Sequence, residues 1–160
     1  MKELYPLFFE PVLKNYLWGG RNFEKLDRSL PGNERVAESW EIAAHNDGMT
    51  VVKNGYYAGR ELGELVEHLG EALVGTKNQW ALNRGKFPLL IKLIDANKNL
   101  SVQVHPDDDY AKQHEGNELG KSEMWIILHA EPGAEIIYGL DEQVTKETFK
   151  NAIEGGNLGE

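Results

Sequence analysis

One stretch of the chain, residues 89–128, constrains the fold more than any other. Within it, residues 100–105 read Leu-Ser-Val-Gln-Val-His, so apolar and polar side chains alternate strictly. Because successive side chains of a strand point to opposite faces, this alternation predicts a β-strand with Ser101, Gln103 and His105 on one side. Glu123 then opens a second apolar run over residues 124–128, which predicts another strand.

Gln103, His105 and Glu123 carry the side chains of a borderline-hard metal site. On one strand face, Gln103 and His105 are neighbours about 6–7 Å apart along the strand. An imidazole, a carboxylate and an amide oxygen that converge inside a small β-structure suit zinc or a similar divalent ion. A Gln-x-His pair on a strand is more often an ordinary polar face, so the spacing alone leaves both interpretations open.

Short strands separated by turns are predicted along most of the chain. The further strand-like segments are an opening one within residues 4–20, and residues 36–43, 49–52, 87–95 and 135–138. Leucines at helical spacing predict a helical insertion over residues 61–80. Such a pattern is typical of a mainly-β antiparallel sandwich or barrel with helical additions.

Two shorter helices are predicted near the centre and the end of the chain. Residues 106–111 begin with a proline and an acidic run, whose carboxylates cap the first amides and oppose the positive end of the helix dipole. We therefore assign Asp107, Asp108 and Asp109 to the helix start and not to catalysis. Residues 145–153 read as a second helix with two glycines beyond its end.

Composition excludes several classes of function. The formal net charge is -9, whereas a protein that binds nucleic acid needs a basic surface. No apolar segment is long enough to span a membrane, and the N-terminus does not read as a signal peptide. The absence of cysteine rules out disulfides and thiolate metal ligands. These features predict a cytoplasmic protein with no membrane and no nucleic-acid partner.

Two lysines stand out beside the proposed metal ligands. Lys92 lies in the middle of the apolar run 87–95, where an ammonium is costly to bury without a partner or a wet pocket. It is either a snorkelling surface lysine or a cation of the pocket. Lys121 lies two residues before Glu123, so on a strand the two share a face and a cation stands next to the proposed ligand.

Three segments, PLLIKLIDA, LSVQVHPDD and GKSEMWIIL, occur in this order and at separations that resemble type I mannose-6-phosphate isomerase (phosphomannose isomerase), of the cupin superfamily. The opening KNYLWGG and the segment ESWEI are also similar to this family. The resemblance implies a cupin jelly-roll barrel or sandwich over residues 1–160, with residues 61–80 as the helical insertion.

The resemblance also implies the roles of individual residues. Gln103, His105 and Glu123 match three of the family's zinc ligands, with one Zn²⁺ per chain. For catalysis it favours Lys121 and Lys92 as cations of the pocket. Glu38 is a candidate for proton transfer, as is Glu41, and Trp40 and Ser101 are expected to contact the substrate.

The implied activity is an aldose–ketose isomerisation that interconverts mannose 6-phosphate and fructose 6-phosphate, so the expected partner is a phosphorylated sugar. Moving a carbonyl from C1 to C2 removes a proton next to that carbonyl, and a zinc ion on the sugar oxygens stabilises the resulting negative charge. The alternatives are a non-catalytic cupin module that binds a metal or a sugar, and another metal-dependent cupin enzyme such as an oxygenase.

The chain resembles the N-terminal half of this family. A fourth ligand, a histidine, and a catalytic arginine lie further along in family members. We therefore expect residues 1–160 alone to be a poor catalyst with weak metal affinity. Unpaired strand edges and exposed apolar surface would favour self-association of such a truncated chain.

Overall fold

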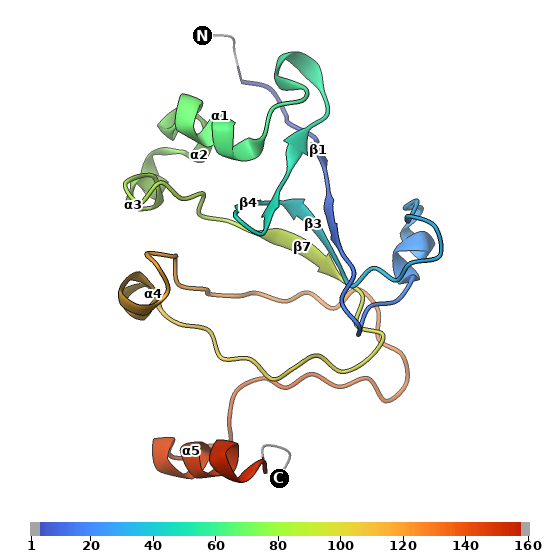
Figure 1. Cartoon of the computed structure of the whole chain (residues 1–160), viewed down its shortest axis with the longest axis vertical. Helices are drawn as coiled ribbons and strands as arrows, with labels where there is room; N and C mark the ends of the chain where they lie inside the picture. The colour runs from blue at the N-terminus through green and yellow to red at the C-terminus, as the bar shows by residue number, and fades with distance from the viewer. Residues whose placement is uncertain (1–3, 158–160) are drawn as a thin grey trace. The chain divides into compact units, whose positions relative to one another are not determined.

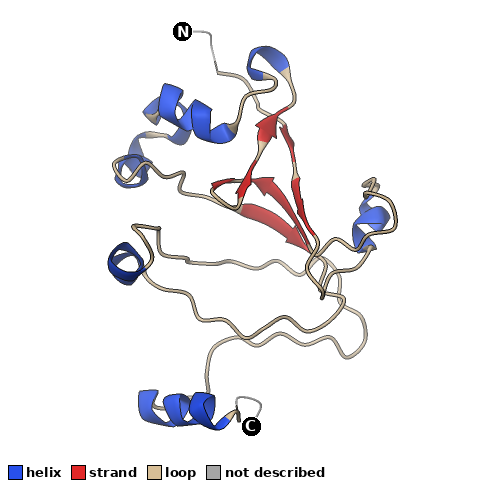
Figure 2. Cartoon of the chain, in the orientation of Figure 1, coloured by secondary structure: helices blue, strands red, loops and turns tan. Residues whose placement is uncertain are grey.

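The computed structural model describes residues 4–157, so the ends of the domain predicted over 1–160 lie outside the described residues. The chain forms two compact units, residues 1–123 and 124–160. Figures 1 and 2 show the strands in the first of these units, between residues 9 and 94. The candidate site lies entirely in the first unit.

A three-stranded antiparallel sheet carries the chemistry of the first unit. It has the order β2 (Val12–Lys14), β3 (Glu38–Ile42) and β7 (Ile91–Ile94). Trp40 lies opposite Val12 on one side and Lys92 on the other. Since directly opposed residues share a face, this register puts Lys14, Glu38, Trp40 and Lys92 on one face of the sheet.

Two smaller antiparallel pairs complete the strands of the described residues. β1 (Phe9–Glu10) pairs with β6 (Val51–Val52), and β4 (Ala44–His45) pairs with β5 (Gly48–Met49) through a two-residue turn. The 3-10 helices η1 (Asn22–Leu26) and η2 (Gly55–Tyr57) lie in the connections. The prediction of strands with intervening turns is confirmed for this part of the chain.

The predicted helical stretch 61–80 contains α1 (Leu62–Leu69), α2 (Glu71–Val74), η3 (Thr76–Asn78) and the start of α3 (Gln79–Leu82). The apolar stripe of α1 is buried: Leu65 and Leu69 pack with Val52 and Tyr57 in the core of this unit. Burial of such side chains contributes roughly 1.5–3 kcal/mol each. The helices therefore cover the β1–β6 pair from one side.

The two shorter predicted helices also form, and each has a side-chain cap at its start. α4 (Asp108–His114) begins after Asp107, whose carboxylate accepts a hydrogen bond from the Tyr110 amide. α5 (Lys146–Gly155) begins after Thr145, which forms a capping box with Thr148. The predicted role of the acidic run at a helix start is confirmed.

Three predicted strands are wrong: residues 100–105, 124–128 and 135–138 have no strand assignment in the structure. They run as irregular segments (Figure 2), and no backbone hydrogen bond between described residues joins 100–105 to a neighbouring strand. Their apolar side chains stay exposed, as at Val104 and Ile126. Alternation specifies the two faces of a strand, but only a ladder partner makes it a strand.

The fold-class prediction is therefore confirmed only in part. Within residues 4–157 the sheets are small and antiparallel, they do not close into a barrel, and five α-helices accompany seven short strands. None of the helices among these residues has the length and apolar character needed to cross a membrane.

Candidate metal and substrate site

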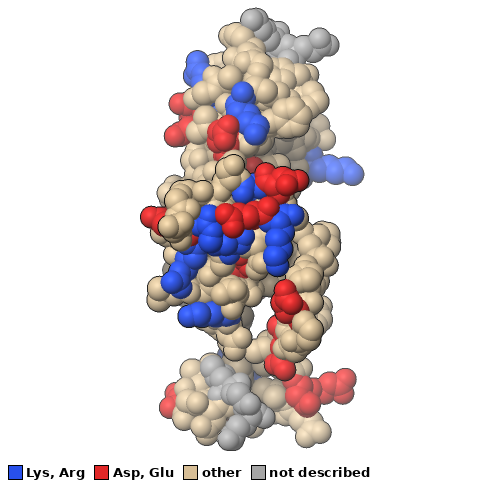
Figure 3. Space-filling model, turned by 90° about the vertical axis from the view of Figure 1, so that its right-hand side faces the viewer, with Lys and Arg blue, Asp and Glu red and all other residues tan. Residues whose placement is uncertain are grey.

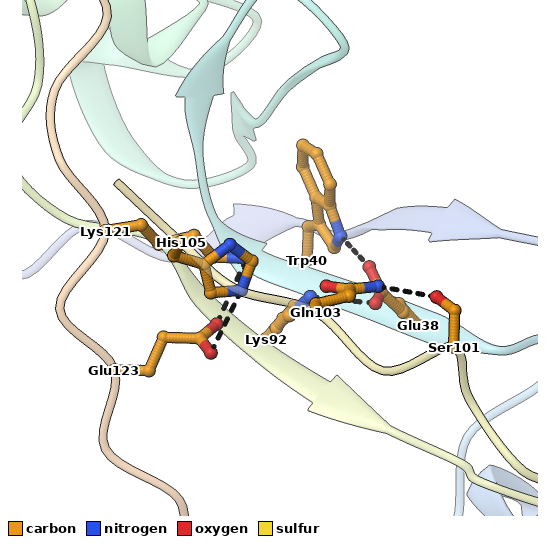
Figure 4. A network of polar contacts seen from close by, with 8 residues as sticks. All are labelled: Glu38, Trp40, Lys92, Ser101, Gln103, His105, Lys121 and Glu123. Atoms are coloured by element: carbon orange, nitrogen blue, oxygen red, sulfur yellow. Dashed lines mark hydrogen bonds and ion pairs between the residues drawn. The ribbon is translucent and has the colours of Figure 1, made fainter. Parts of the chain in front are cut away.

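His105, Lys121 and Glu123 meet at one point of the first unit (Figure 4). The Nε2 atom of His105 lies 3.3 Å from Oε2 of Glu123 and 3.2 Å from Nζ of Lys121. The Lys121 ammonium also lies 3.1 Å from Oε1 of Glu123. The structure therefore brings two of the three predicted metal ligands together and places the predicted cation beside both.

Two hydrogen bonds hold the segments of this trio together. The Lys121 amide donates to the Pro106 carbonyl at 3.0 Å. The Gly120 amide donates to Oδ1 of Asp108 at 2.8 Å. The residues just after His105 are thus tied to the residues just before Glu123, without the two strands that the sequence predicts.

Gln103 lies next to His105 and is oriented by Ser101. Its amide nitrogen donates to the Ser101 hydroxyl at 3.1 Å. Figure 4 shows the amide oxygen at the opposite end of the group, on the side of His105. The amide oxygen is the atom that a divalent metal would use, and the bond to Ser101 leaves that atom available.

Glu38 joins the two remaining predicted site residues on the sheet face. Its Oε1 accepts from Nζ of Lys92 at 2.8 Å, and its Oε2 accepts from the Trp40 indole N–H at 2.7 Å. The side chains of Glu38 and Lys92 are 8% and 20% exposed. Lys92 is thus a paired cation in a largely buried position, and the snorkelling interpretation is wrong.

Trp40 is held on several sides. The Lys14 ammonium lies 4.5 Å from the centroid of its ring, and the His45 ring meets it edge-on with centroids 6.1 Å apart. A Cβ atom at Gly48 would lie 2.7 Å from the indole, so the β4–β5 turn approaches the ring as closely as only glycine permits. Lys14 also donates to the Asp47 carbonyl. The indole is therefore a fixed wall beside Glu38.

Glu41, the other candidate for proton transfer, lies on the opposite face of β3. Its carboxylate receives both guanidinium nitrogens of Arg28 at 2.9 Å and the Ser39 hydroxyl at 2.7 Å. It lines a separate hollow of about 370 Å³ together with Phe9, Phe23 and others. The structure does not bring Glu41 together with the other predicted site residues.

Tyr16 extends the site toward the N-terminus. Partial burial raises the pKa of its phenol, and the negative charges of Glu38 and Asp47 raise that pKa further. Its ring also packs against Trp18, with centroids 5.7 Å apart. The phenol stays protonated at neutral pH and remains a hydrogen-bond donor near the Glu38 side of the sheet.

The donor set fits a divalent cation. The Lys121 ammonium can only donate, so its hydrogen bond to His105 uses the lone pair on Nε2, which is the lone pair that a metal ion would bind. A cation bound by that lone pair and by the carboxylate satisfies both groups. Among residues 4–157, no cluster of three or more His, Asp or Glu side chains forms a metal site, so Gln103 would supply the third ligand.

Three supporting residues were missed by the sequence analysis. Lys14 packs over Trp40, Asp108 binds the Gly120 amide, and Arg84 pairs with Asp108 at 3.7 Å. The only sequence signal for Asp108 was its place in the acidic run, which the helix start already explained. Lys14 and Arg84 carried no signal, because their partners are distant in sequence.

The chain matches the family model described as "Phosphomannose isomerase type I, catalytic domain" over residues 7–129. It is 46% identical to "Mannose-6-phosphate isomerase ManA" of Bacillus subtilis, across 97% of this chain and 47% of the relative. It is 44% identical to "Mannose-6-phosphate isomerase" of Streptococcus mutans, across 95% of this chain and 46% of the relative.

A solved structure agrees with these sequence comparisons. The crystal structure of the mannose 6-phosphate isomerase from Bacillus subtilis superposes with a TM-score of 0.83 at 38% identity, covering 95% of this chain and 46% of that one. The chain belongs to the type I phosphomannose isomerase family, as its sequence motifs indicate. It spans about half the length of the curated relatives it matches.

Proposed function

We propose that this chain carries the metal-binding part of an aldose–ketose isomerase that interconverts mannose 6-phosphate and fructose 6-phosphate. The observation that carries the proposal is the mutual contact of His105, Lys121 and Glu123, inside the segment that matches the family model. We take the identity of the substrate from the relatives, which are named mannose-6-phosphate isomerases. The jelly-roll arrangement of the family is part of the same proposal.

Gln103, His105 and Glu123 would hold one zinc ion. When bound, such an ion acts as a Lewis acid on sugar oxygens and stabilises negative charge that develops on them. Glu123 would contribute the anionic ligand, and His105 would contribute its Nε2 atom, which lies 3.3 Å from the Glu123 carboxylate. The bond between Gln103 and Ser101 keeps the weaker amide donor oriented.

The lysines serve the anionic substrate in this proposal. Lys121 lies beside both ligands and can direct its ammonium at a developing oxyanion. Lys92 is paired with Glu38, which also fixes Trp40 as a wall of the pocket. Because both oxygens of Glu38 are engaged, we propose that Glu38 orients Lys92 and Trp40 and leaves proton transfer to another group.

The test combines a metal measurement with an activity measurement. Purified chain is analysed for zinc, and mannose 6-phosphate isomerisation is followed before and after removal of metal with a chelator. We expect weak binding that approaches about one zinc per chain at saturating zinc, and a slow isomerisation that is lost with the metal and returns with it. Zinc bound without any isomerisation would support the alternative, a cupin module that binds a metal or a sugar. Activity that survives complete metal removal would contradict the proposal.

A further inference from the structure

We infer that Arg84 is a positioning residue: it holds the loop 116–121, which presents Lys121 and Glu123 to His105. The inference deepens the proposed function and rests on it for the identity of the reaction. Arg84 belongs to the helical stretch and lies outside the set of metal ligands and pocket cations. Its effect on the site is carried by the backbone of the loop.

The backbone of Arg84 is fixed by the way α3 ends. The Lys86 amide donates to the Ala81 carbonyl, and the Gly85 amide donates to the Leu82 carbonyl. Gly85 has a φ of 66°, so these bonds form the Schellman motif with glycine in the left-handed position. Ala81 is fully buried. The Arg84 side chain therefore extends from a fixed helix end and not from a flexible connection.

The Arg84 guanidinium contacts three groups within residues 108–118. Its NH2 donates to the Asn117 carbonyl at 3.0 Å and also to the Glu118 carbonyl. Its NH1 lies 3.7 Å from the Asp108 carboxylate. The Arg84 side chain is 15% exposed and that of Asp108 is 60% exposed, so the guanidinium is the shielded partner in this pair. Its Nε is buried without a partner among residues 4–157, so the holding contacts are those of NH1 and NH2.

The loop is shaped to offer these carbonyl groups. Gly116 and Asn117 have φ values of 61° and 66°, two successive left-handed residues that only glycine and asparagine adopt readily. Lys86, two residues after Arg84, also forms an ion pair with Glu118 at 2.5 Å. Two residues at the end of α3, Arg84 and Lys86, thus bind adjacent residues of the loop.

Asp108 connects Arg84 to the residues of the candidate metal site. The same Oδ1 atom that faces Arg84 accepts the Gly120 amide at 2.8 Å, and the next amide, that of Lys121, donates to Pro106. Lys121 and Glu123 follow directly. Loss of Arg84 would release the Asn117 and Glu118 carbonyls and leave Asp108 without its cation. The distance of Glu123 from His105 would then no longer be fixed.

The test compares Arg84→Gln with Arg60→Gln. Arg60 lies in the same compact unit and pairs with Glu64 on the surface, where both side chains are mostly exposed, so it is a matched arginine without a loop contact. Amide hydrogen exchange is measured at Gly120 and Lys121, with Glu115, bonded to Ala111 in α4, as an internal reference. Zinc affinity is measured by chelator competition, and kcat and KM for mannose 6-phosphate are determined with zinc at saturation.

For Arg84→Gln we expect exchange at Gly120 and Lys121 to accelerate at least about tenfold, while Glu115 stays unchanged. Zinc affinity should fall about 10- to 100-fold, the range typical when a residue that supports metal ligands is lost. At saturating zinc, kcat should fall more than KM changes. Arg60→Gln should match the parent chain in every measurement. Unchanged exchange at Gly120 and Lys121, or unchanged zinc affinity, would overturn the inference.

A second pair of variants keeps the inference testable if Arg84→Gln does not fold. Asp108→Ala removes the acceptor of the Gly120 amide, whereas Asp108→Asn retains an acceptor oxygen there. We expect fast exchange at Gly120 in the first and near-parent exchange in the second; equal exchange in both would overturn the inference. If the parent chain shows no isomerisation, the proposed function fails, and the exchange measurements still decide whether the loop is held.

Discussion

Gly120 lies where a side chain has no room. A Cβ atom there would lie 2.4 Å from the Asp108 nitrogen and 2.5 Å from the Asp107 carbonyl carbon, which are backbone atoms at the start of α4. Backbone cannot turn aside as the end of a flexible side chain can. The close approach is what allows the Gly120 amide to reach Asp108 and brings Lys121 alongside Pro106.

Gly120→Ala should therefore separate the two segments of the site. We expect a loss of stability of about 1–3 kcal/mol, as for other overpacked positions, together with weaker zinc binding. Urea unfolding and zinc titration measure the two effects. Gly155→Ala is the control, because a Cβ there would meet only the Asn157 side chain at 3.6 Å, and its stability should stay within about 0.5 kcal/mol. Full zinc affinity in Gly120→Ala would show that the close approach is not needed.

The neighbours His105 and Lys121 should respond differently to truncation. His105→Ala removes a proposed ligand, so both zinc binding and isomerisation should be lost. Lys121→Ala removes charge beside the ligands, so zinc should remain while kcat falls by about 100-fold or more. Zinc content and turnover of the two purified variants check this. Equal loss of metal in both variants would mean that Lys121 supports the site's structure instead.

Strand β3 carries charged residues on both of its faces. Glu38 faces Lys92 on one side, and Glu41 faces Arg28 on the other. Each carboxylate is met by a cation and by a second donor from within the strand itself, Trp40 for Glu38 and Ser39 for Glu41. The strand can hold two charges in its interior because every one of these carboxylate oxygens has a partner.

Glu38→Gln should leave Lys92 as an uncompensated charge in a largely buried position. We expect the free energy of unfolding to drop by about 3 kcal/mol, because breaking one side of a buried pair costs more than removing both. In the double variant Glu38→Gln with Lys92→Met, much of that loss should be recovered. Urea unfolding of the parent, the two single variants and the double variant measures this coupling. Additive losses in the double variant would show that the two side chains act independently.

The sequence predicted elements well wherever local rules decide them. The apolar spacing of α1, the acidic start of α4 and the glycines at the end of α5 are all local signals, and all three helices form. The predicted strand at 100–105 failed because alternation is local while a ladder partner is not. The site shows the same division.

His105 and Glu123 were found from motifs, whereas the contacts of Arg84 with the loop depend on a three-dimensional approach that no spacing encodes. Glu41 was a candidate because it lies near Glu38 in sequence, yet alternation along β3 places it on the other face. The two-residue period of ESWEI showed that Glu38 and Glu41 lie on opposite faces of the strand. It did not show which of the two faces meets Lys92.

At the scale of the molecule, charge is mixed and not segregated. Figure 3 shows Lys and Arg side chains gathered among Asp and Glu on one face. Pairs such as Arg21 with Glu24, at 2.6 Å, contribute to this mixing. In that pair, the hydrogen bond to Arg21 lowers the pKa of the Glu24 carboxyl. With a formal net charge of -9, the sugar phosphate that we propose as substrate would depend on the local cations and on the proposed metal for its attraction.

Large apolar side chains are exposed in residues 124–138. Met124 is 84% exposed and Tyr138 is 96% exposed, with Ile126 and Leu128 between them at 71% and 70%. A series of this kind in one segment favours association between copies of the chain. We therefore expect residues 1–160 to self-associate with rising concentration, as sedimentation velocity would show.

Ile126→Lys with Leu128→Lys should shift that equilibrium toward the monomer. Leu17→Lys is the matched control, since Leu17 is 81% exposed but lies in the other unit, and it should leave the association unchanged. A monomer at all concentrations in the parent chain would contradict the prediction.

The contacts of Trp40 with Lys14 and Glu38 should give this residue a distinct tryptophan fluorescence. Trp80 and Trp125 are about half exposed, whereas Trp40 is 7% exposed and has an ammonium over its ring and a carboxylate on its indole N–H. An indole shielded in this way emits at shorter wavelength than one in water, and its emission responds to charge placed nearby. Trp40→Phe should therefore abolish most of the emission change that sugar phosphate or zinc produces, while Trp80→Phe should preserve it. Fluorescence titration of the two variants would then read out occupancy of the pocket without any turnover.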